Sequence, residues 1–112
     1  MQIVSDKLTL SDLKELACRF GNLVKAVVDI EKEIMAIDAE LHGDEEVYLL
    51  ENGSKQKNLW GINLYPELEN EDFIEFDSMI NLRPASGNSS RGVDDPKLRE
   101  KITKIVHKLI QK

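Results

Sequence analysis

The chain lacks residues and segments on which several protein classes depend. It has 112 residues and a single cysteine, Cys18, so neither an internal disulfide nor a Cys-x-x-Cys site can form. No apolar run approaches the roughly 20 residues that a helix needs to span a bilayer. The first residues show neither the basic start nor the apolar stretch of a secretory signal peptide. These absences predict a cytoplasmic protein with no membrane association.

Aromatic residues are also scarce, and the charge is mostly of one sign. One Trp, two Tyr and three Phe leave few side chains on which bases could stack. The formal net charge is −6, with a net of −11 over residues 1–80 and +5 over residues 81–112. A lysine stripe in the basic end is typical of the solvated side of an amphipathic helix. We therefore expect no nucleic-acid partner.

The composition that is present suits a globular protein. Hydrophobic residues make up 41% and charged residues 32% of the chain. A chain of this length can bury an ordinary core without a disulfide or a structural metal. We expect residues 1–112 to form one domain.

Three segments carry helix signals. Thr9 is a predicted N-cap, and apolar spacing predicts a helix over about 10–20. A second helix is predicted over about 40–52, with acidic residues near its start, where the helix dipole favours them. Asp95 is predicted to cap a last helix that begins with Pro96.

Four segments alternate as strands do. Segments 24–30 and 34–37 predict one hairpin, and segments 59–65 and 74–82 predict a second. The element order is then α-β-β-α-β-β-α. It predicts an α+β fold with a four-stranded, mostly antiparallel sheet and three helices packed on one face. The order of the strands stays open.

The segment that follows the last predicted strand is the first candidate site. It is small and polar, irregular from Pro84 to Asp94, and has an arginine near each end. Its Gly and Asn residues could turn backbone N–H groups inward as an anion nest. Arg83 and Arg91 could then clamp a phosphate or carboxylate. The alternative is a mobile surface loop with solvated arginines.

The polar face of the second predicted hairpin is the other candidate. If both strands pair, six polar side chains project together: Asn63, Tyr65, Glu75, Asp77, Asn81 and Arg83. They could bind a polar ligand or a divalent cation, or perform acid–base chemistry. The alternative is an ordinary solvated sheet face. The spacing of His42 to Glu45 and Glu46 matches no established zinc motif, and we predict no metal site.

Three functions follow from these candidates, and the sequence specifies no cofactor. The first is a non-enzymatic binding module for a small anion or a protein partner, with six ligand-binding residues: Asn63, Asn81, Arg83, Asn88, Ser90 and Arg91. The second is a hydrolase or transferase acting on a phosphorylated substrate, with Glu75 or Asp77 as catalytic base or metal ligand. The third is a structural homodimer formed through an uncovered sheet face or edge.

Several blocks of the chain resemble a small prokaryotic family of unknown function. The blocks are Val24–Glu31, Gly53–Gln56, Leu59–Asn63, Phe73–Pro84, Gly87–Asn88, Ser90–Arg91 and Asp95–Pro96. The similarity spans nearly the whole chain. It implies a stand-alone archaeal or bacterial cytosolic protein, and it implies nothing about mechanism.

Overall fold

A computed structural model of the chain describes residues 1–112 as an α+β fold. The strands are β1 (Gln2–Val4), β2 (Leu8–Thr9), β3 (Val24–Asp29), β4 (Ile34–Ile37), β5 (Leu59–Leu64), β6 (Ile74–Glu75) and β7 (Ile110–Gln111). The helices are α1 (Leu10–Ala17), α2 (His42–Glu51) and α3 (Pro96–Leu109). Five short 3₁₀ helices are η1 (Cys18–Phe20), η2 (Gln56–Asn58), η3 (Asn70–Phe73), η4 (Met79–Asn81) and η5 (Pro84–Ser86).

The strands form a five-stranded antiparallel sheet in the order β1-β4-β3-β5-β6, and β2 and β7 form a separate parallel pair. The three predicted helices and the mostly antiparallel sheet are confirmed, but the prediction of four strands is wrong. The sequence reading missed β1, β2 and β7. These strands have only two or three residues each, which is too short for an alternating pattern to appear.

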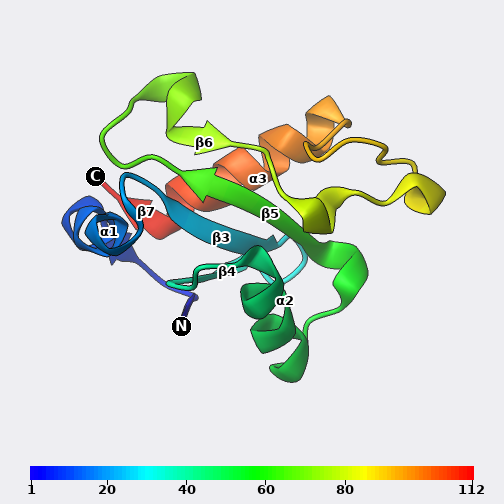
Figure 1. Cartoon of the computed structure of the whole chain (residues 1–112), viewed down its shortest axis with the longest axis horizontal. Helices are drawn as coiled ribbons and strands as arrows, with labels where there is room; N and C mark the ends of the chain where they lie inside the picture. Colours follow the sequence, from blue (N-terminus) through cyan, green and yellow to red (C-terminus); the bar gives the residue numbers. More distant parts are fainter.

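Helices cover both faces of the sheet, so the prediction of helices on one face only is wrong (Figure 1). The larger core, 20 buried residues, includes residues of α1, α3 and the strands. A smaller core of Val27, Ala36, Leu49 and Leu59 lies under α2 on the other face. All six residues of β5 are buried, because this strand lies between the two layers of helices.

The local signals at the helix ends and in the first hairpin are confirmed. Thr9 Oγ1 accepts a hydrogen bond from the Asp12 N–H at 3.0 Å, and Asp95 Oδ1 accepts one from the Lys97 N–H at 2.9 Å. Strands β3 and β4 pair antiparallel, with Asp29 opposite Ile34. These features depend on residues close in the sequence, which is why pattern and capping chemistry predict them.

The predicted strand over 74–82 is wrong beyond Glu75. Only Ile74 and Glu75 pair with β5, and the chain then turns into η4. The turn occurs at Ser78, which is buried: its N–H donates to the Arg91 carbonyl at 2.9 Å, and its Oγ accepts from the Ile80 N–H at 3.3 Å. These hydrogen bonds replace the β-strand pairing with β5 that the alternating pattern predicts for residues 76–82.

A side chain completes the outer edge of β5 where β6 stops. The Gly61 N–H donates to Asn81 Oδ1 at 2.8 Å, and Asn81 Nδ2 donates back to the Gly61 carbonyl at 2.9 Å. Asn81 Nδ2 also donates to the Arg91 carbonyl at 3.0 Å. A Cβ at position 61 would lie 2.6 Å from Ser78, so only glycine permits this close approach. The Asn81 side chain therefore makes the hydrogen bonds that a neighbouring strand would make at Gly61. It also holds the 83–94 loop against β5.

The inner face of α2 carries a carboxyl group without a partner. Glu45 is 0% exposed, and neither carboxylate oxygen forms a well-aligned hydrogen bond, although the Ala39 backbone N–H lies close enough to oppose the effect of burial in part. Burial raises its pKa from 4.5 to about 9. The side chain is therefore neutral in the folded protein at neutral pH, although its place near the start of α2 predicts an exposed, charged group.

Replacing Asn81 with Ala leaves the buried N–H and C=O of Gly61 without partners, so Asn81→Ala should lower the free energy of unfolding by about 3 kcal/mol. Urea denaturation followed by circular dichroism measures the change. Asn22 is exposed, so Asn22→Ala is the matched control, and its free energy of unfolding should be close to that of the wild type. Equal stabilities for the two variants would contradict the edge-completing role.

Replacing Glu45 with Gln should remove a pH dependence of stability. Between the ordinary pKa of 4.5 and the folded value of about 9, the unfolded state loses a proton that the folded state keeps. As the pH rises through this range, this group alone should therefore lower the free energy of unfolding of the wild type by up to about 1.4 kcal/mol per pH unit. Denaturation at pH 5 to 8 should show a flatter profile for Glu45→Gln, whereas Glu51→Gln, on the exposed side of α2, should keep the wild-type slope.

Candidate functional site

Two hollows lie on either side of η4, and Met79 and Ile80 line both. The first, which we call the Trp60–Arg83 pocket, has a volume of about 560 Å³ and is lined by Glu46, Gln56, Lys57, Trp60, Met79, Ile80, Leu82, Arg83 and Ser86. The second, which we call the Asn63 groove, has a volume of about 630 Å³. Its polar lining consists of Lys25, His42, Asn63, Tyr65, Glu75, Asp77, Ser78 and Arg91.

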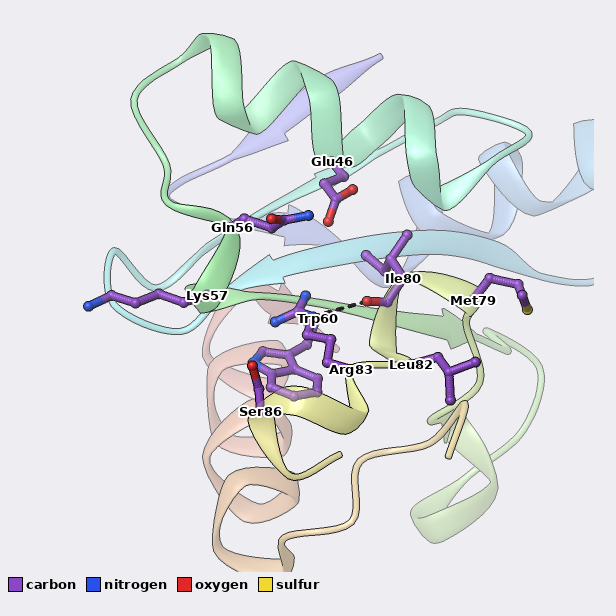
Figure 2. Close-up of a pocket in the computed structure, with 9 residues that line it drawn as sticks. All are labelled: Glu46, Gln56, Lys57, Trp60, Met79, Ile80, Leu82, Arg83 and Ser86. Atoms are coloured by element: carbon purple, nitrogen blue, oxygen red, sulfur yellow. Dashed lines mark hydrogen bonds between the residues drawn. The ribbon is translucent and has the colours of Figure 1, made fainter. Parts of the chain in front are cut away.

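Arg83 is held rigidly at the centre of the first pocket (Figure 2). Its guanidinium carbon lies 4.4 Å from the centroid of the Trp60 ring, at cation–π distance. Nε donates to the Ile80 carbonyl at 3.1 Å, and Nη2 donates to the Leu59 carbonyl. No carboxylate forms a salt bridge with this half-buried cation. Burial lowers the pKa of Arg83 from its ordinary value, and the nearby charge of Glu46 opposes this shift only in part. An arginine keeps its charge at neutral pH.

Trp60 lines the same pocket and carries a buried donor without a partner. The side chain is only 7% exposed, and its Nε1 has no hydrogen-bond partner. Gln56 and Lys57 come from η2 and Ser86 from η5, so two separate segments add polar groups around the indole. Glu46 of α2 is the one acidic residue in the lining. Donor groups therefore outnumber anionic groups in this pocket.

The Asn63 groove is organised around the β5–β6 pairing. Asn63 Nδ2 donates to Glu75 Oε1 at 2.8 Å and to the Asp77 carbonyl at 3.3 Å. The Tyr65 hydroxyl donates to the same Glu75 oxygen at 3.0 Å, and Arg91 Nε donates to Asp77 Oδ1 at 2.8 Å. Burial, and then the bond to Glu75, raise the pKa of Tyr65. Asn63 Oδ1 is left without a partner.

His42 lines this groove from the start of α2. Its Nε2 lies 2.7 Å from the Ile62 carbonyl oxygen, which can only accept, so Nε2 carries the proton. Burial lowers the pKa of His42, and the neutral ring keeps a free acceptor at Nδ1. From the sequence, His42 was weighed only as a metal ligand and was not placed in this groove. The spacing of His42, Glu45 and Leu49 on the inner face of α2 was the signal that could have found it.

The structure separates the two predicted arginines. Four residues of the predicted hairpin face come together in the groove: Asn63, Tyr65, Glu75 and Asp77. Arg91, which the sequence placed in the loop, joins them there. Arg83 instead lines the other pocket, on the far side of η4. The two guanidinium groups therefore do not face one shared pocket, and the geometry does not support a joint clamp on one anion.

Three further predicted ligand residues have structural roles in the loop or at the edge of β5. Asn81 and Asn88 are buried, and all their side-chain groups bond to protein atoms. Ser90 Oγ donates to Asp94 Oδ1 at 2.5 Å, and this bond together with the Ser89 N–H lowers the pKa of Asp94. Most backbone N–H groups of the loop bond within it, so they do not form the anion nest that the glycines suggest.

The structure brings no three His, Cys, Asp or Glu side chains into a group that could hold a metal ion. None of its helices combines the length and the apolar character needed to cross a bilayer.

Comparison with known proteins places the chain in a family. No curated protein and no solved structure matches it. A family model described as "Protein of unknown function (DUF5674)" matches residues 2–109, which is nearly the whole chain. This match confirms the resemblance to an uncharacterised family that the sequence blocks indicate. The chain belongs to the DUF5674 family, for which no function is known.

Proposed function

We propose that this chain is a binding module for a small organic anion with a single negative charge, such as a monocarboxylate, and that the Trp60–Arg83 pocket is its site. The observation that carries the proposal is the half-buried Arg83 guanidinium, which forms no salt bridge although Glu46 lines the same pocket. A partly desolvated charge is costly unless it is paired, so an anion in the pocket would remove a cost that the free protein bears.

The position of Arg83 suits recognition because the group is already fixed. Two carbonyls and the Trp60 ring hold the guanidinium, while Nη1 donates to no protein atom. A preorganised donor loses little conformational entropy when it binds a ligand. Guanidinium N–H groups also match the geometry of a carboxylate.

The indole of Trp60 supplies a second argument. A buried N–H without a partner costs about 1–3 kcal/mol, and an acceptor atom of a ligand would satisfy it. This N–H and the free Nη1 of Arg83 belong to neighbouring side chains of one pocket, so we expect the two oxygens of a carboxylate to engage one donor each. The same ligand would thereby relieve two unfavourable features of the free protein.

The other residues that line the pocket indicate the charge of the ligand and the character of its uncharged part. Arg83 and Lys57 against Glu46 give the pocket one formal positive charge, which suits a monoanion better than a phosphate dianion. Met79, which is 63% exposed, and Leu82 offer an apolar wall to the organic part of the ligand.

The two other functions receive less support. A hydrolase or transferase that uses both arginines would need them in one cleft, whereas they line different hollows. A homodimer through an uncovered sheet face is disfavoured because helices cover both faces. Pairing through a sheet edge stays a prediction, and light scattering over a range of concentrations would test it.

Trp60 is the only tryptophan, so its emission tests the proposal directly. Sodium propionate and sodium benzoate should change the fluorescence saturably, whereas sodium chloride at equal ionic strength should not. Arg83→Gln should weaken binding at least tenfold, and circular dichroism would check that it folds. Trp60→Phe, which removes the N–H and keeps an aromatic ring, should weaken binding severalfold when followed by thermal shift.

Lys55→Gln provides the matched control, because Lys55 is exposed, lies two residues from Lys57 and does not line the pocket. It should bind propionate like the wild type. The proposal fails if no monoanion gives a saturable change in the millimolar range, or if folded Arg83→Gln binds as tightly as the wild type. Preference for inorganic phosphate over both carboxylates would overturn the assignment of a monoanion.

A further inference from the structure

The Asn63 groove contains a buried acceptor that the protein does not satisfy. Asn63 is 7% exposed and lines the groove. Its Nδ2 bonds to Glu75 and to the Asp77 carbonyl, so the amide orientation is fixed and Oδ1 is the oxygen left without a donor. A buried polar atom without a partner is rare and needs an explanation. A donor group on a ligand would provide one.

Further acceptors line the same groove. Glu75 and Asp77 each bring a carboxylate to the groove, and the neutral ring of His42 adds the free Nδ1. Protein donors occupy Glu75 Oε1 and Asp77 Oδ1, while the second oxygen of each carboxylate has no protein partner. This set of acceptors is suited to an ammonium group, which carries three donors and a positive charge.

Cations line the groove as well. Lys25 lies directly opposite Asn63 in the β3–β5 register, so the two side chains are cross-strand neighbours. Lys25 forms no salt bridge, and Arg91 uses only Nε in its bond to Asp77. Two cations and two carboxylates leave the groove without formal net charge, with an unpaired ammonium beside the unpaired acceptor.

We infer that the Asn63 groove is a second binding site, for a small zwitterion of the amino-acid class. The ammonium group of the ligand donates to Asn63 Oδ1 and to Glu75. Its carboxylate binds Lys25, with the terminal nitrogens of Arg91 within the same lining. The groove and the Trp60–Arg83 pocket differ in chemistry, so this inference does not depend on the proposed function.

Chemical-shift mapping of the ¹⁵N-labelled chain tests the inference with three matched probes. β-Alanine combines the charged groups of propylammonium and propionate on one three-carbon chain. At pH 7 and equal ionic strength, β-alanine should shift the Asn63 side-chain amide resonance saturably, and propylammonium chloride should do so more weakly. Sodium propionate should leave that resonance unchanged. The indole N–H of Trp60 reports the other pocket, so failure at one site is distinguishable from failure at the other.

Two variants separate the two halves of the ligand. Glu75→Gln keeps an oxygen for Tyr65 and Asn63 but removes the charge, and it should weaken β-alanine binding at least tenfold. Glu69→Gln, an exposed acid outside the groove, is the control and should bind normally. Lys25→Gln should reduce β-alanine affinity to that of propylammonium without weakening propylammonium itself.

Three results would overturn the inference. The first is no saturable shift at Asn63 with tens of millimolar β-alanine. The second is unchanged affinity in Glu75→Gln with a wild-type dispersion of resonances. The third is equal binding of propionate and β-alanine at the Asn63 resonance, which would show that the groove does not recognise the ammonium group.

Discussion

The pairing of the Asn81 side chain with the backbone of Gly61 is the interaction on which both hollows beside η4 depend. β6 pairs with β5 only at Asn63 and Leu64, so the buried edge at Gly61 needs other partners. A primary amide offers the same donor and acceptor as a peptide group, and Asn81 supplies both. Because Gly61 has no side chain, η4 can approach β5 closely enough for these bonds.

That close approach produces the two hollows. η4 stands against β5 as a ridge, with Met79 and Ile80 facing both sides. Trp60 and Asn63 project from opposite faces of β5, and each keeps one polar atom that no protein group satisfies. The unpartnered atom of Trp60 is a donor, Nε1, in a pocket with a net positive charge. The unpartnered atom of Asn63 is an acceptor, Oδ1, in a groove without formal net charge. The two sides of the ridge therefore differ in polar chemistry, and the two proposed ligand classes follow from this difference.

The sequence predicted correctly the features that depend on residues close together in the chain, and it failed where contacts between distant residues decide the structure. The caps at Thr9 and Asp95 and the β3–β4 hairpin depend on neighbours in the sequence, and all were predictable. The 74–82 strand failed because alternation shows only which residues could share a face. Ser78 and Asn81 instead found partners at Arg91 and Gly61, and these contacts override the local preference.

The sequence by itself determined the three helices, the first hairpin, the nearness of Asn63 to Glu75 and membership of an uncharacterised family. Only the tertiary structure decided that both sheet faces are covered and that Arg83 and Arg91 lie on different sides of η4. It also decided that Glu45 is buried and neutral. The physical reason is that burial and side-chain hydrogen bonding depend on which distant segments meet, and periodicity along the chain does not encode those meetings.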